Sequence, residues 1–539
     1  MRVILVLFLT FQVSTFLLGQ PGERVEVVKD YKADIPETPR IELNPNLLPA
    51  DTSSRRQEFR LMTRPYEVSY LTPVIRPMRL PASPDLKRFP GFLSLGFGLL
   101  KNREIKGSYA LAAGANTMIN LDLNHRGISN SKQITHQQYN ATKAGAGLDF
   151  LSKAGYTLST QWHFGQENRY FYGYHGYNKE KNLSRDYDAN RVSRRFHDYG
   201  GHLSFYNHQP TAGQLDYKAT LQVDAFRDNL NQRQVGLRTD LSLSRNMGDL
   251  GRLKVAFRAE SSGFRDAADT SQRLGIYLFH PSWSLQTGRL MLEAGAKLGL
   301  QNTKWVLLPS LESSFAVVPD KLAIYLTAQG DVVQQNFQSL ASENPYLANR
   351  LRVTNSMGNT YTTGLKGSGS AGSYRIEGGI EMQDNLALYI TTADSIPRFL
   401  VQYDRARIGF IRGEFTLSQG ENLVIRGAFQ QRFFRLDRES RPWHIPSFTA
   451  MSGLKYKFQK PALAITTELN AERGVPYPGG DGTLSLGPLI EWNLGASYQI
   501  HKQADAFLQG NNLLNNRRQR WKYYDSIGIN FLAGIRLHF

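Results

Sequence analysis

The sequence predicts an all-β protein, a large antiparallel transmembrane β-barrel of about 22 strands. Apolar and polar residues alternate through runs of about ten residues, the length of a tilted strand that crosses a bilayer. Short and long connections between these runs also alternate along the chain. Beyond the N-terminus there is no apolar stretch of about 18 residues, so the sequence offers no transmembrane helix.

Residues 1–19 predict a cleaved signal peptide. Arg2 precedes an apolar run that extends to Leu18, and the small residue Gly19 lies at the expected cleavage point. A buried N-terminal helix is the alternative, but the proline- and charge-rich chain after Gln20 suits a new mature terminus. We therefore expect export and a location in the cell outer membrane.

Cysteine is absent from the chain. Its absence excludes a lipoprotein anchor, disulfide bonds and thiolate metal sites. Stability must therefore come from burial and backbone hydrogen bonding.

Residues 20–90 predict an extended, proline-rich segment that lies in the periplasm or in the barrel lumen. Eleven of the 23 prolines fall there, a density that disfavours a packed sheet and favours polyproline-like chain. A barrel of about 22 strands has a lumen wide enough to need filling. This segment, inward-folded external loops or a partner protein could fill it, and a disordered periplasmic leader is the alternative for the segment itself.

The barrel is expected over residues 91–539, and its strands are clearest where the alternation is strict. In residues 215–225, Leu215, Leu221 and Val223 lie on one face, whereas Asp216 and Lys218 lie on the other. The same pattern recurs in residues 156–164, 235–244 and 454–459. A soluble secreted protein with many strands is the alternative, but its strands are usually only about five or six residues long.

The connections supply an independent test of this fold, because the long ones should all lie on one side of the membrane. The long connections, expected outside, are residues 127–140, 173–195, 335–358, 391–398, 435–447, 473–487 and 511–524. The short ones, expected in the periplasm, begin at Lys153, Thr287, Val318, Ala371, Ser418 and His501. This parity predicts an even number of strands, about 18 to 24.

Residues 527–539 predict the strand that closes the barrel. Its odd-numbered positions are apolar and its even-numbered positions mostly polar. An unpaired edge in hydrocarbon would leave backbone groups unsatisfied, so we expect this strand to pair with the first. The ending resembles the closing strand of bacterial outer-membrane proteins, which serves as a recognition signal for the barrel-assembly machinery. The residues that carry this resemblance are Phe531, Ile535, Leu537 and Phe539.

Residues 507–539 resemble the end of TonB-dependent receptors, in which a strand runs into the motif Gly-Asn-Asn-Leu-Leu-Asn, here residues 510–515, before an external loop. Residues 343–353, ENPYLANRLRV, are similar to a segment of related barrels of the Bacteroidetes group. The resemblance implies a solute channel or receptor whose lumen is occluded by the N-terminal segment or by loops. The alternative is a non-transporting barrel subunit of an outer-membrane assembly or export complex.

The N-terminal part departs from that family. TonB-dependent receptors carry a globular plug domain much longer than residues 20–90, so we expect a full-length plug to be absent. The residues Glu23, Val25, Val27 and Val28 are similar to a TonB box, which pairs with an energy-transducing partner by β-augmentation. The alternative is a single strand that packs against the periplasmic rim.

The net charge of +18 is concentrated partly in the expected external loops. Lys and Arg at the outer rim could bind phosphorylated glycolipids through charge-assisted bonds, although solvated loop charge is an equal alternative. The candidate glycolipid contacts are Arg194, Arg195, Arg517, Arg518, Arg520 and Lys522. We expect no nucleic-acid partner, because an exported barrel meets few such targets.

Aromatic residues gather near the expected strand ends. Examples are Tyr172, Tyr174, Phe433, Trp521 and Tyr524. Their placement predicts a girdle at the membrane interfaces, and a sugar-stacking surface is the alternative.

The sequence indicates no enzyme, no cofactor and no metal site. Its 11 histidines are scattered, and no nucleophile motif is present. Inward-facing charged residues could instead line a transport pathway, or could neutralise one another across a filled lumen. These residues are Asp216, Lys218, Asp224, Arg238, Asp240, Lys455 and Lys457.

Overall fold

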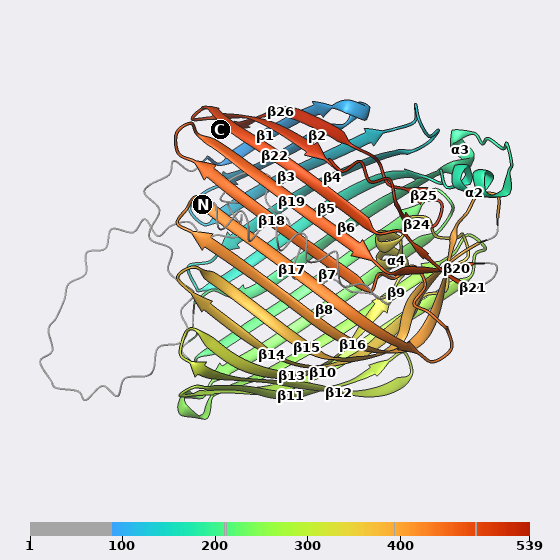
Figure 1. Ribbon diagram of the computed structural model, residues 1–539. Helices are drawn as coiled ribbons and strands as arrows, with labels where there is room; N and C mark the ends of the chain where they lie inside the picture. Colours follow the sequence, from blue (N-terminus) through green and yellow to red (C-terminus); the bar gives the residue numbers. More distant parts are fainter. Residues whose placement is uncertain (1–88, 210, 212, 393, 480–481) are drawn as a thin grey trace, which may run out of the picture.

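The computed structural model describes residues 89–209, 211, 213–392, 394–479 and 482–539. Within these residues, 22 strands form one closed antiparallel barrel (Figure 1). The predicted fold class and the even strand number are therefore confirmed. The expected signal peptide, residues 1–19, and the TonB-box-like residues Glu23, Val25, Val27 and Val28 lie outside the described residues, as does the rest of residues 20–88.

The barrel strands follow one another around the wall in chain order. They are β1 (Gly91–Gly98), β2 (Arg103–Ala112), β3 (Thr117–Ser129), β4 (Gln138–Leu151), β5 (Tyr156–Tyr170), β6 (Ser193–Asn207), β7 (Leu215–Asp228), β8 (Arg233–Asn246), β9 (Arg252–Arg265), β10 (Ser271–Thr287), β11 (Leu290–Gln301), β12 (Lys304–Val318), β13 (Leu322–Gln335), β14 (Thr354–Gly369), β15 (Gly372–Thr391), β16 (Phe399–Gln419), β17 (Leu423–Leu436), β18 (Phe448–Phe458), β19 (Leu463–Arg473), β22 (Leu489–His501), β23 (Ala504–Asn511) and β26 (Asn530–His538).

The remaining elements are short and lie in the connections. They are η1 (Leu99–Lys101), α2 (Tyr174–Lys181), α3 (Ala189–Val192), η2 (Gly248–Leu250), α4 (Phe337–Glu343), the hairpin of β20 (Val475–Gly479) and β21 (Gly482–Leu486), and the hairpin of β24 (Gln519–Trp521) and β25 (Tyr524–Asp525). None of the helices in the described part of the chain is long and apolar enough to cross a membrane.

The barrel closes between its first and last strands, as expected. In the antiparallel register of β1 and β26, Leu95 lies opposite Ile535. The amide of Gly91 donates a hydrogen bond of 2.9 Å to the carbonyl of Phe539, so pairing continues to the last residue. The two edge strands are therefore paired with each other, as a lipid environment requires.

The seven predicted long connections all lie at one end of the barrel, and the predicted short turns lie at the other. Figure 1 shows α2, α3, α4 and both small hairpins gathered at the right-hand end, which we call the long-loop end. The C-terminus lies at the opposite, short-turn end (Figure 1). This arrangement follows from the antiparallel pairing of consecutive strands, because every second connection returns to the same side.

The two faces of the wall differ as the alternation predicts. Leu221, Val223 and Leu237 are exposed on the outer surface. The inner surface is identified by contacts between strands that are not neighbours in the sheet, since Arg258 on β9 pairs with Asp331 on β13. Such a contact fits only the concave side of the barrel, so the polar positions face the lumen.

Candidate functional site

The largest buried apolar cluster lies at the long-loop end, where loops pack on one another and on inward-facing strand residues. We call it the loop core. Its members are Phe171, Tyr174, Val192, Phe196, Phe226, Phe264, Leu274, Phe337, Leu340, Ala341, Tyr346, Leu347, Leu351, Val353, Ala387, Tyr389, Ile396, Phe399, Trp521 and Tyr524. Because these residues come from β6, β7, β9 and β10, from β15 and β16 and from four loops, the cluster joins separate parts of the wall across the barrel opening.

A stack of two tyrosines joins two of these loops. The rings of Tyr346 and Tyr524 lie with their centroids 3.7 Å apart and their planes 19° apart. The Tyr524 hydroxyl donates a hydrogen bond of 2.6 Å to the carbonyl of Pro397, in the β15–β16 connection. Burial raises the pKa of Tyr524 well above its ordinary value, so this hydroxyl stays a neutral donor. One side chain thus links three connections.

The connection between β23 and β26, residues 512–529, contacts several others. The Lys522 ammonium pairs with Glu180 of α2 at 2.8 Å, and the Tyr523 hydroxyl donates a hydrogen bond of 3.0 Å to the same carboxylate. The Tyr172 hydroxyl donates a hydrogen bond of 2.8 Å to the carbonyl of Asp525. Together these contacts hold this connection against residues 171–192.

Two carboxylates of the β5–β6 connection, those of Glu180 and Asp186, are held in their charged form. Burial alone would raise the pKa of Glu180, but the hydrogen bonds from Lys522 and Tyr523 bring it below its ordinary value. The hydrogen bond from the Tyr174 hydroxyl, 2.7 Å long, lowers the pKa of Asp186. Both carboxylates therefore favour the packed arrangement of the loops at neutral pH.

The short helix α4 sits inside the barrel opening. Asn336 caps it by accepting a hydrogen bond of 2.9 Å from the Ser339 amide, in a capping box that fixes its first turn. Phe337, the first residue of the helix, is fully buried. Its ring contacts those of Phe226 and Phe264 on the inner wall, with centroids 5.1 and 5.3 Å away.

Arg194 of β6 binds the β13–β14 connection, residues 336–353, to the barrel wall. Its guanidinium pairs with Asp228 at 3.0 Å and donates hydrogen bonds to Gln232 at 2.7 Å and to the carbonyl of Leu347 at 2.6 Å. Only 1% of Arg194 is exposed. The prediction that Arg194 contacts a glycolipid is therefore wrong, because its donors are used inside the barrel and no surface remains for a phosphate.

The prediction that aromatic residues near this end form an interfacial girdle also needs a correction. Tyr174, Trp521 and Tyr524 are buried in the loop core, so they do not form a girdle around the outside of the barrel. The sequence did not locate this cluster, because loops lack the alternation that fixes the direction of a side chain in a strand. Tyr346 and Leu347 lie inside ENPYLANRLRV, whose apolar content was the available signal.

The predicted lumen-lining residues on β7 and β8 face inward, and several pair with neighbours. Arg238 lies 2.7 Å from Asp240 and 3.9 Å from Glu260. Asp216 pairs with Arg252. These contacts favour mutual neutralisation along one wall, which was the alternative interpretation for these residues.

The other candidates for the lumen are less tightly held by charge. The Gln222 amide donates a hydrogen bond of 2.8 Å to Asp224, and the Lys218 ammonium lies 5.9 Å from the centroid of the Tyr206 ring. Lys455 and Lys457 lie on the inner face of β18, opposite Thr466 and Ala464 of β19. A role for these residues in a pathway stays a prediction.

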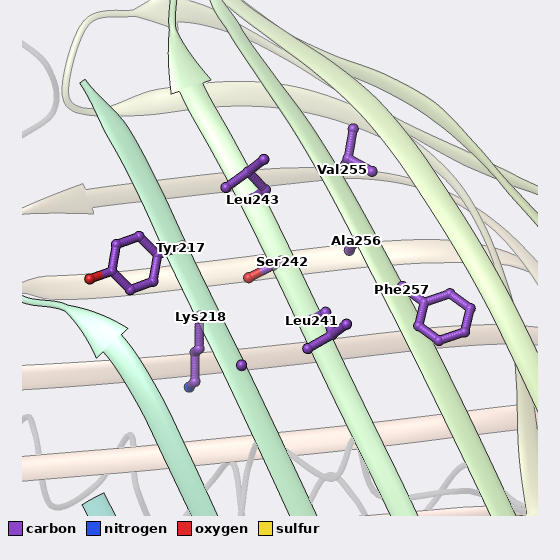
Figure 2. Close-up of a pocket in the computed structure, with 9 residues that line it drawn as sticks. Tyr217, Lys218, Leu241, Ser242, Leu243, Val255, Ala256 and Phe257 are labelled. Atoms are coloured by element: carbon purple, nitrogen blue, oxygen red, sulfur yellow. The ribbon is translucent and has the colours of Figure 1, made fainter. Parts of the chain in front are cut away.

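The outer wall carries the apolar face. Figure 2 shows Tyr217, Leu241, Leu243, Val255 and Phe257 on the neighbouring strands β7, β8 and β9, where they line a pocket in this face. This surface is what a hydrocarbon environment requires of a barrel wall.

The remaining glycolipid candidates lie at the long-loop end. Arg195, Arg517 and Arg518 are exposed. Arg520 instead pairs with Glu472 at 2.9 Å, and Lys522 pairs with Glu180. Arg520 thus holds the β23–β26 connection to strand β19, and Lys522 holds it to α2.

The sequence matches no protein-family model and no curated protein, but solved structures share the barrel. The siderophore receptor PirA from Acinetobacter baumannii superposes with a TM-score of 0.64 at 9% identity, covering 83% of this chain and 80% of that one. The ferric enterobactin receptor from Pseudomonas aeruginosa gives 0.62 at 12% identity, with 83% and 81% covered.

The ferripyoverdine receptor of the outer membrane of Pseudomonas aeruginosa gives a TM-score of 0.62 at 13% identity, with 84% of this chain and 72% of that one covered. At these identities the likeness establishes a shared fold. The chain therefore has the 22-strand barrel fold of siderophore receptors.

Proposed function

We propose that this protein is an outer-membrane receptor or solute channel whose external opening is covered by its own loops. One observation carries the proposal: the loop core spans the opening of a barrel too wide to be filled by its wall side chains alone. The fold shared with siderophore receptors supports it. In this proposal the long-loop end is external and the short-turn end periplasmic.

A solute can enter only if the loop core opens. The contacts that would have to break are the Tyr346–Tyr524 stack and the Lys522–Glu180 pair, both between connections rather than within the sheet. Such contacts can break while the strand pairing stays intact, because loops open at a lower free-energy cost than the sheet unfolds.

The proposal extends to parts of the chain outside the described residues. Residues 1–19 act as a cleaved signal peptide, and residues 20–90 occlude the lumen in place of a full-length plug. Glu23, Val25, Val27 and Val28 offer a strand to a TonB-type partner.

The motifs at residues 343–353 and 510–515 support a relation to TonB-dependent receptors of the Bacteroidetes type.

Membrane assembly completes the proposal. Phe531, Ile535, Leu537 and Phe539 project from the outer face of the closing strand, where the barrel-assembly machinery would read them. The protein is proposed to have no enzymatic activity, in keeping with the receptors that share its fold. A non-transporting barrel subunit of an outer-membrane assembly or export complex is the less favoured role.

Single-channel conductance in a planar bilayer tests the transport function. The wild type should be silent, whereas Tyr346→Ala combined with Tyr524→Ala should open a pore when residues 20–90 are also removed. The matched control also lacks residues 20–90 and changes two aromatic residues of the outer wall, Phe257→Ala with Tyr277→Ala. It should stay silent. If the loop variant without residues 20–90 is also silent although it inserts as a folded barrel, transport through the lumen is contradicted.

A further inference from the structure

Arginine side chains form a row on the outer face of the wall, at the long-loop end of β7, β8, β9 and β10. In the sheet register, Arg227 lies opposite Arg233 and Arg233 lies opposite Arg265. Arg273 continues the row, because it lies opposite Gly263, two residues before Arg265. We call these four residues the arginine row.

The row faces away from the lumen. Arg227, Arg233 and Arg265 have the same strand parity as the exposed Val223 and Val235. The intervening positions, among them Phe226, Gln234 and Phe264, are buried on the inner side. The guanidinium groups therefore project from the surface that meets the membrane.

The position of the row along the strands matches the edge of the apolar belt. On β8 the outward positions after Arg233 are Val235, Leu237, Thr239, Leu241 and Leu243, and the next is Arg245. At about 3.3 Å per residue and a tilt of about 45°, Arg233 and Arg245 lie about 28 Å apart along the membrane normal. The apolar band of an outer-membrane barrel is about 25 Å tall, so the row lies at headgroup level.

Three like charges on directly opposed strand positions are unfavourable by themselves. Cross-strand partners have Cβ atoms only about 5 Å apart, and like charges so placed destabilise a sheet. The carboxylate contact that the row makes is the Arg265–Asp269 pair of 3.0 Å, in which Asp269 is largely exposed. Within the described part of the chain, Arg233 and Arg273 have no carboxylate partner. The row therefore carries an excess of positive charge that an external anion would relieve.

We propose that the arginine row binds the phosphate groups of a phosphorylated glycolipid in the external leaflet. Guanidinium groups form bidentate, charge-assisted bonds with phosphate oxygens, and a row of them suits a headgroup with more than one phosphate. Space for the sugar lies just below the row, because Gly263 has no atom within 4 Å of where a Cβ would stand. Tyr199, whose ring lies 5.7 Å from the Arg227 guanidinium, adds an interfacial aromatic group.

This inference rests on the proposed function only in placing the long-loop end outside an outer membrane. It concerns the outer wall and requires neither a lumen pathway nor movement of the loop core. If the opened loop variant conducts no ions, the arginine row should still bind lipid. If the row binds no lipid, the opened loop variant should still conduct. The two proposals can therefore fail separately.

The test is lipid retention by the full chain, purified in mild detergent and incubated with nanodiscs that contain an acylated glucosamine disaccharide carrying two phosphates. The site variant is Arg227→Gln, Arg233→Gln and Arg265→Gln. The control variant, Arg185→Gln, Arg245→Gln and Arg289→Gln, removes the same charge from exposed positions elsewhere. Heat-modifiable gel migration establishes that each variant is a folded barrel.

We expect the wild type and the control variant to retain the glycolipid and the site variant to retain it at least about tenfold less tightly, because several charge-assisted bonds are lost together. Removing both phosphates from the lipid should have the same effect on the wild type. Equal retention by the site variant and the wild type would overturn the proposal. Equal retention of phosphatidylglycerol would overturn the assignment to a glycolipid.

Discussion

Tyr524 stacks on Tyr346 across two connections that are far apart in the sequence, and it also bonds to the carbonyl of Pro397. The loop core therefore depends on contacts that form only when the barrel has closed. The β23–β26 connection joins the last two strands, and its partners come from the middle of the chain. Loosening of this single stack should affect several loops together.

Shortening Tyr524 should open the loop core, whereas removing its hydroxyl should weaken it only slightly. Tyr524→Ala removes the stack and creates a cavity, at a cost of about 3–5 kcal/mol in local stability. Tyr524→Phe removes one hydrogen bond, at a cost of about 1 kcal/mol. Hydrogen exchange of residues 336–353 in detergent measures both effects. Unchanged exchange in the alanine variant would contradict the role assigned to the stack.

Removal of the Arg194 side-chain charge should detach residues 336–353 from the wall. Arg194→Gln leaves Asp228 buried without its partner, which costs about 3–5 kcal/mol. Limited proteolysis should then cut residues 336–353 in the variant and leave them intact in the wild type. The neighbouring exposed Arg195 supplies the control, since Arg195→Gln should change nothing. Equal protection in both variants would show that the buried pair does not hold the loop.

Acid should loosen the contact between α2 and the β23–β26 connection. The pKa of Glu180 and that of Asp186 are lowered in the packed state from ordinary values of 4.5 and 3.8. Glu180 therefore stabilises this contact, and Asp186 stabilises the packing of residues 174–186, at pH values above the ordinary pKa of each carboxylate. This stabilisation is lost as the pH falls through the lowered value.

Hydrogen exchange of residues 174–186, measured from pH 7 to pH 3, checks this prediction. Exchange corrected for its intrinsic pH dependence should rise at the acid end, and Glu180→Gln should raise it already at pH 7. Residues 419–423, in the short turn between β16 and β17, serve as the internal control. A rise of the same size in that turn would indicate general unfolding instead.

Barrel closure should be sensitive to a methyl group at Gly534. A Cβ there would overlap the carbonyl oxygen of Leu95 and the ring of Phe507, and the backbone of β1 cannot move without losing its pairing. Gly534→Ala should therefore lower the folded fraction on a heat-modifiable gel. Gly263→Ala is the matched control, because a Cβ at that position meets open space. Equal folded fractions would contradict this account of closure.

Charge reversal inside the lumen should change ion selectivity once the pore is open. Arg238 lies on the inner face beside Asp240 and Glu260, so Arg238→Glu in the opened loop variant should favour cations. Reversal potentials across a salt gradient measure the effect, and Arg245→Glu on the outer face should have none. If Arg238→Glu changes only the folding yield, the lumen-lining role fails.

The sequence by itself determined the barrel. Period-two alternation in residues 215–225 and 527–539 places polar groups on one face of each strand. Because lipid tolerates only a closed sheet, this local pattern predicted that the barrel closes and that its number of strands is even. The inward direction of Asp216 and Arg238 followed for the same reason, because a strand leaves no freedom about which face a residue occupies.

Only the tertiary structure decided where the loop residues lie. Arg194 and Arg195 are adjacent and identical in the sequence, yet one is buried in an ion pair and the other is exposed. The sequence is compatible with two positions for Tyr174 and Tyr524, in contact with lipid or buried between loops, and the structure places both in the loop core. Loops have no repeating geometry that fixes a side-chain direction, so their contacts depend on strands brought together by closure of the whole barrel.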